Sequence, residues 1–141
     1  MRRYLGLDVG ARRIGIAVTD PLGMTAQGLE TLHRTNLQSD IAHILTLVDH
    51  YEAQGLVCGL PKNMNNTLGF KAEEVKAFID ALCDVRDLPI YWVDERLTTV
   101  QAEQVLIEAD VSRKKRKKSV DKLAAVFILQ LWMDQNIGDM L

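Results

Sequence analysis

Apolar residues form short runs in some parts of the chain and recur at three- and four-residue spacing in others. Short runs rich in Val, Ile and Leu favour strands, whereas i, i+3, i+4 spacing favours amphipathic helices. Turn-forming residues such as Gly10 and Pro21 separate the early runs. The pattern predicts strands at about 4–9, 13–19, 25–32, 55–60 and 90–93, and helices at about 41–48, 75–82, 98–109 and 119–136.

The order of these elements predicts an α/β protein. The first three strands follow one another through short turns and form an antiparallel meander, whereas the later strands are separated by helices and need crossover connections. Such a chain forms a mixed sheet with helices on its faces. Ser39 is the expected N-cap of the first helix, and Thr98 begins a capping box for the third. A length of 141 residues suits one domain spanning 1–141.

The composition is that of a folded protein, with 48% hydrophobic and 26% charged residues. No apolar stretch approaches the roughly 20 residues of a membrane span, so we expect a cytoplasmic protein with no membrane partner. Cys58 and Cys83 lack the spacing of a metal or redox motif, and we expect both to be buried thiols.

The charge pattern contains a run of six basic residues just before the last predicted helix. The run contains six of the 17 basic residues, so the rest of the chain has 11 basic and 19 acidic residues. Such segregation is typical of a phosphate-binding segment, although a solvated loop or a nuclear localisation tract has the same composition. The run consists of Arg113, Lys114, Lys115, Arg116, Lys117 and Lys118.

Three carboxylates lie at or near the ends of predicted elements. Asp8 interrupts an apolar strand, where an ionised group needs a cation or several hydrogen-bond donors. Glu95 follows the fifth strand, although Asp94, Glu95 and Arg96 could instead form a surface ion-pair cluster. Asp121 falls in the first turn of the last predicted helix, where the helix dipole favours an ionised carboxylate and acidic residues are common for structural reasons alone.

Together these three carboxylates suit a site for Mg²⁺ or Mn²⁺. Hard divalent cations prefer oxygen ligands and bridge to substrate phosphate, and two of them can activate water and neutralise the leaving oxygen of a phosphodiester. The polar segment 62–69 follows the carboxyl end of a predicted strand, which is where α/β proteins usually bind ligands. Lys62 in this segment and Arg96 beside Glu95 are further candidate contacts for nucleic acid.

Several short motifs occur along nearly the whole chain in the order typical of one bacterial family. They are Leu7-Asp8-Val9-Gly10, Gly15-Ile16-Ala17, Gly59-Leu60-Pro61, Asp94-Glu95-Arg96-Leu97-Thr98-Thr99, and Lys117-Lys118-Ser119-Val120-Asp121-Lys122-Leu123-Ala124-Ala125 with Ile128-Leu129-Gln130. In these motifs the chain resembles the YqgF-type pre-16S rRNA nucleases, which are related to Holliday-junction resolvases.

The resemblance has implications for fold, site and substrate. It implies an RNase H-like three-layer fold with a five-stranded sheet in the order 3-2-1-4-5. It also implies that Asp8, Glu95 and Asp121 are the catalytic, metal-binding residues. The implied activity is metal-dependent cleavage at the 5′ end of precursor 16S rRNA during ribosome biogenesis, with branched DNA and a ribosomal particle as further partners.

Two other functions are compatible with the same residues. Asp8, Gly10 and Gly15, with Asp20 further on, are also similar to the first phosphate loop of actin- and Hsp70-like ATPases. Those proteins clamp a nucleotide between two domains, whereas this chain has the length of one. A non-catalytic RNA-binding or assembly factor is the other alternative, because a basic run binds phosphate without a metal. The sequence does not distinguish an RNA substrate from a DNA substrate, or a monomer from a dimer.

Overall fold

The structure is a computed structural model that describes residues 2–61, 69–95 and 113–136, with the backbone alone for residues 113–121. Its elements are β1 (Arg3–Val9), β2 (Arg13–Thr19), β3 (Ala26–His33), α1 (Leu37–Tyr51), β4 (Ala53–Leu60), α2 (Phe70–Val85), β5 (Ile90–Asp94) and α4 (Arg113–Gln135). The strand predictions are confirmed to within two residues at each end. The predicted helix at 98–109, with its capping box at Thr98, lies outside the described residues.

The five strands form one mixed sheet in the order β3-β2-β1-β4-β5, which confirms the expected fold. β1 and β3 each pair antiparallel with β2, whereas β4 pairs parallel with β1 and with β5. The turn between β1 and β2 is closed by the Gly10 N–H, which donates to the Arg13 carbonyl oxygen at 2.9 Å. The parallel pairs are connected through α1 and α2, as parallel strands require.

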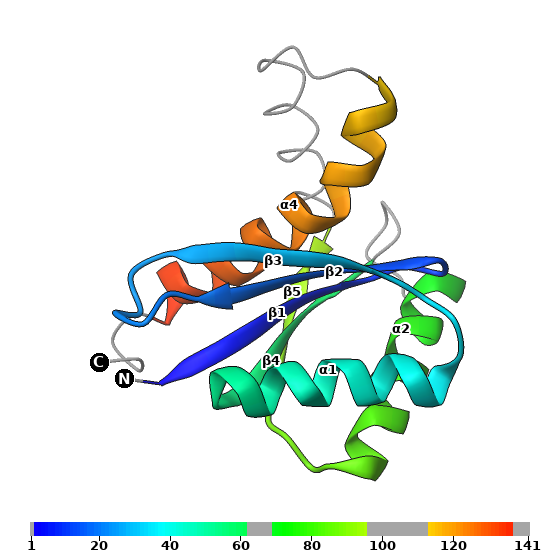
Figure 1. The fold of residues 1–141 in the computed structure, drawn as a ribbon, viewed down its shortest axis with the longest axis horizontal. Helices are drawn as coiled ribbons and strands as arrows, with labels where there is room; N and C mark the ends of the chain where they lie inside the picture. The colour runs from blue at the N-terminus through cyan, green and yellow to red at the C-terminus, as the bar shows by residue number, and fades with distance from the viewer. Residues whose placement is uncertain (1, 62–68, 96–112, 137–141) are drawn as a thin grey trace.

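Helices cover the two faces of the sheet, with α1 and α2 on one face and α4 on the other (Figure 1). The residues of β1 alternate between these faces: Leu5 and Leu7 belong to the core against α1 and α2, and Tyr4 belongs to the core against α4. The core against α4 consists of Tyr4, Ala17, Val57, Val93, Ala125, Ile128, Leu129, Trp132 and Met133.

α4 lies close to the sheet because Gly6 has no side chain. A Cβ atom at Gly6 would lie 2.8 Å from the Cβ of Leu129 and 2.9 Å from the carbonyl oxygen of Ala125. Two residues earlier in β1, the ring of Tyr4 lies 4.7 Å from that of Trp132. Residue numbers therefore rise along β1 as they fall along α4, so the two elements run in opposite directions.

The starts of the helices differ from the sequence prediction. α1 begins at Leu37 and its N-cap is Asn36, whose side chain accepts the Ser39 N–H at 2.9 Å. Ser39 therefore lies within the first turn, because an asparagine three residues earlier caps equally well. Cys58 is buried as predicted, whereas Cys83 is partly exposed. Among the residues that the structure describes, no helix is long and apolar enough to cross a membrane.

Candidate active site

Asp8 lies on the α4 face of β1. Its neighbours Leu7 and Val9 belong to the core against α1 and α2, so strand alternation places Asp8 on the opposite face, two positions after Gly6. The residue is only 7% exposed and pairs with Gly15 of β2. A carboxylate at this depth is retained where it binds a cation or hydrogen-bond donors.

Glu95 lies on the same face, immediately after the last residue of β5. Val93 belongs to the core against α4, so alternation within β5 places Asp94 on the other face. Glu95 is already helical, and its contact gives its position: the Cβ of Glu95 lies 3.4 Å from where a Cβ of Gly59 would stand, on the side that Ile128 of α4 covers. Glu95 rather than Asp94 therefore shares a face with Asp8.

Gly59 of β4 lies between these two carboxylates. β4 is flanked by β1 and β5, and the pairing of Leu7 with Cys58 puts Gly59 at the next register position, beside Asp8. A Cβ at Gly59 would come within 2.5 Å of the Cδ1 of Ile128, so the glycine also admits α4. Carboxylates on two strands about 10 Å apart can face a common cation across this glycine.

Asp121 lies in α4, but not in its first turn as the sequence predicted. α4 begins at Arg113, so the basic run forms the start of the helix and more than two turns precede Asp121. Lys and Arg are good helix formers, and six of them extend the helix backwards instead of forming a loop before it. The dipole of the helix N-terminus acts within its first turn and therefore does not act directly on Asp121.

Several predicted contacts involve side chains that the structure does not describe. They are those of Asp121 and of the basic residues Arg113, Lys114, Lys115, Arg116, Lys117 and Lys118, while Lys62 and Arg96 lie wholly outside the described ranges. Within the described part of the chain, no three metal-ligating side chains form a cluster. The structure thus brings Asp8 and Glu95 to one face, and the roles of the other residues stay predictions.

Arg13 is a candidate that the sequence prediction missed. Ile14 and Ile16 of β2 belong to the core against α1 and α2, so alternation places Arg13 and Gly15 on the α4 face. Gly15 pairs with Asp8, and Arg13 lies two positions from it along β2. The same period-two pattern in the sequence could have shown that a cation shares the face of Asp8.

Asp20 has a structural role in the turn between β2 and β3. Its carboxylate accepts the N–H of Met24 at 2.9 Å, the N–H of Thr25 at 3.2 Å and the hydroxyl of Thr25 at 2.7 Å. The hydrogen bond from Met24, followed by those from Thr25, lowers the pKa of Asp20. These contacts account for the residue without a nucleotide, which weakens the ATPase alternative.

Comparison with protein families identifies the group to which the fold and these residues belong. A family model described as "RuvX: Holliday junction resolvase" matches residues 2–135. The chain belongs to the RuvX family. The resemblance found in the motifs is thereby confirmed.

Relatives and solved structures agree with membership of the RuvX family. Proteins from Clostridium acetobutylicum and Clostridium tetani, each named "Putative pre-16S rRNA nuclease", are 52% and 53% identical over 132 residues. The matches cover 94% of this chain and 98% and 96% of theirs. The T. thermophilus RuvC structure in complex with a Holliday junction substrate has a TM-score of 0.60 at 15% identity, covering 95% of this chain and 97% of that one. The RuvC likeness supports the fold.

Proposed function

We propose that this RuvX family member is a divalent-metal-dependent nuclease that hydrolyses phosphodiester bonds in precursor 16S rRNA in the bacterial cytoplasm. The observation that carries the proposal is the placement of Asp8 and Glu95 on one face of the sheet, on either side of Gly59. The relatives named as pre-16S rRNA nucleases support RNA as the substrate class.

The register of α4 over β1 supports Asp121 as the third ligand. Gly6 of β1 meets Ala125 of α4. Asp8 lies two residues further along β1, about 6.7 Å, and Asp121 lies four residues earlier in α4, about 6 Å. Because β1 and α4 run in opposite directions, these two steps lead the same way along the sheet. The turn of α4 that contains Asp121 is therefore the one expected opposite Asp8.

The donor set fits Mg²⁺ or Mn²⁺, because it consists of carboxylate oxygens and one of them lies in an apolar strand. When bound, such cations supply the Lewis acidity that activates water and stabilises the leaving oxygen. Asp8, Glu95 and Asp121 would hold the cations beside the scissile phosphate, and no side chain would form a covalent bond to it. One P–O bond forms to the water oxygen while the P–O bond to the leaving sugar oxygen breaks.

Basic residues provide the binding surface for the substrate backbone. The run at the start of α4, with Lys62 and Arg96, would contact phosphates along the strand, and these contacts carry little sequence information. Arg13 lies on the face of Asp8, and we assign it to a phosphate close to the cleaved bond. Its guanidinium can contact two phosphate oxygens at once.

A branched-DNA resolvase is the second candidate, favoured by the description of the matching family model. The test compares cleavage of a precursor 16S rRNA fragment and of a synthetic four-way DNA junction, each with Mg²⁺ and with EDTA. The proposal requires metal-dependent cleavage of the RNA that is lost in the Asp8→Asn and Glu95→Gln proteins. Preference for the junction would favour the resolvase, and tight RNA binding without cleavage would favour an assembly factor.

A further inference from the structure

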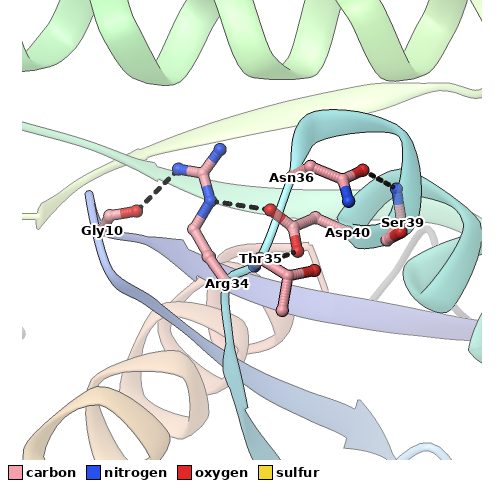
Figure 2. Close-up of polar contacts among 6 residues, drawn as sticks. All are labelled: Gly10, Arg34, Thr35, Asn36, Ser39 and Asp40. Atoms are coloured by element: carbon pink, nitrogen blue, oxygen red, sulfur yellow. Dashed lines mark hydrogen bonds and ion pairs between the residues drawn. The ribbon is translucent and has the colours of Figure 1, made fainter.

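Arg34 holds the turn that follows Asp8. It lies just after β3, and its backbone N–H donates to the Arg12 carbonyl oxygen at 2.9 Å. Its side chain reaches the same turn, because Nη1 donates to the Gly10 carbonyl oxygen at 2.8 Å. Figure 2 shows the guanidinium lying between this carbonyl and the start of α1. One residue therefore fixes the β1–β2 turn through both its backbone and its side chain.

Asp40 in turn fixes the guanidinium of Arg34. The Nε of Arg34 donates to Asp40 Oδ2 at 3.1 Å, and the Thr35 N–H donates to Asp40 Oδ1 at 3.1 Å (Figure 2). Asp40 is 2% exposed and lies in the first turn of α1. The Cζ of Arg34 also lies 4.8 Å from the ring centroid of Phe78 in α2. The guanidinium thus has one defined position.

This bracing acts at Gly10, just after the last paired residue of β1. The antiparallel pairing of β1 with β2 ends at Val9 and Ile14, and its parallel pairing with β4 ends at Leu7 and Cys58. Asp8 is therefore close to the end of the pairing of β1 with both neighbouring strands. Carboxylates gathered in this site would also repel one another before a cation binds. A displacement of about 1 Å in a catalytic group can reduce the rate about 100-fold.

We propose that Arg34, held by Asp40, is a positioning residue that keeps Asp8 in its metal-binding place through the Gly10 carbonyl. This inference rests on the proposed function, because it takes Asp8 to be a metal ligand. Arg34 is paired with the Asp40 carboxylate, so it contributes geometry and not free positive charge toward the substrate. Its loss is expected to affect metal binding and turnover more than nucleic-acid affinity.

The test uses Arg34→Lys in the full chain. Lysine keeps a cation beside Asp40 but lacks the planar fork that reaches Asp40 and Gly10 together. The matched control is Arg86→Lys, because Arg86 forms an ion pair of the same kind with Asp49 on the surface. Measurements are kcat, KM for RNA, half-saturating Mg²⁺, and Mn²⁺ affinity by electron paramagnetic resonance, all below the melting temperature of every variant.

We expect Arg34→Lys to weaken Mn²⁺ binding and raise half-saturating Mg²⁺ by about tenfold and to lower kcat, while KM stays near the wild-type value. Arg86→Lys should match wild type in every measurement. If Arg34→Lys lowers only the melting temperature and leaves kcat and Mn²⁺ affinity unchanged, Arg34 is purely structural and the inference is wrong. Should Arg34→Lys fail to fold, the double variant Arg34→Gln with Asp40→Asn leaves no buried charge unpaired and is held to the same criteria.

Asp8→Asn separates this inference from the proposed function. Wild-type Mn²⁺ affinity in the Asp8→Asn protein would overturn the proposed function itself, and the inference with it. Loss of Mn²⁺ binding in Asp8→Asn, with wild-type affinity and kcat in Arg34→Lys, would overturn the positioning role alone. Loss in both, with the Arg86→Lys control unaffected, supports both.

Discussion

The ring of Tyr4, near the start of β1, lies 4.7 Å from the ring of Trp132, near the end of α4. Tyr91 of β5 joins this contact, with its ring 4.9 Å from that of Trp132. The aromatic cluster fixes one end of α4 on the sheet, and the close approach at Gly6 fixes its middle. The position of Asp121 along the sheet is therefore set by apolar contacts that lie away from the carboxylates.

Gly6→Ala should destabilise the protein because its Cβ would meet Leu129 and the backbone of Ala125. Overpacking of this kind costs about 1–3 kcal/mol, measured as the free energy of unfolding in urea. Gly28→Ala is the control: the three atoms nearest to its Cβ all belong to the side chain of Lys122, which is exposed and can move. Equal stability loss in the two variants would contradict the close fit of α4 on β1.

Asp8→Asn should abolish Mg²⁺-dependent cleavage without reducing the stability of the metal-free protein. Converging carboxylates repel one another, so removing one charge leaves the melting temperature unchanged or raises it. Asp49→Asn is the control, since it breaks a surface ion pair with Arg86 and should leave cleavage intact. Thermal melting in EDTA together with a cleavage assay checks both effects. A clear loss of stability in Asp8→Asn would indicate a structural ion pair instead of a metal site.

Neutralising Arg113, Lys114, Lys115 and Arg116 should weaken binding to RNA of unrelated sequences and flatten its salt dependence. Each lost single-strand phosphate contact reduces the slope of log K against log salt by about 0.7. Binding titrations at several salt concentrations measure this slope. The control neutralises Lys76 and Arg86 of the α2 region, on the opposite side of the sheet, and should leave the slope unchanged. A wild-type slope in the fourfold variant would exclude the run from the binding surface.

Stability should fall at alkaline pH because of Cys58. Burial, and to a smaller extent the charge of Cys83, raises the pKa of the Cys58 thiol. The folded state therefore keeps the proton when the unfolded state loses it, so the stabilisation is complete below about pH 8.5 and declines above it. The expected contribution to the slope is about 1.4 kcal/mol per pH unit. Urea unfolding between pH 8 and 9.5 should show a shallower decline in Cys58→Ala, and identical declines would disprove the assignment.

The sheet could be predicted because its strands are marked by local apolar runs and turn residues, and the order 3-2-1-4-5 came from the family resemblance. The start of α4 could not be predicted, because Ser119 resembles an N-cap and the six preceding charges resemble a loop. Their helix propensity decided the outcome. Similarly, Asp8 is conspicuous in an apolar strand, whereas the Arg34–Asp40 pair depends on a tertiary contact with no local signal.

The place of α4 in the chain has a consequence for how the protein is made. All five strands precede α4, so a ribosome synthesises the complete sheet before the helix that covers its second face. Until α4 docks, Asp8 and Glu95 lack the helix that carries the third proposed ligand. On the proposed mechanism, the chain would become competent for cleavage only after α4 has been made, so a partly made chain would be inactive.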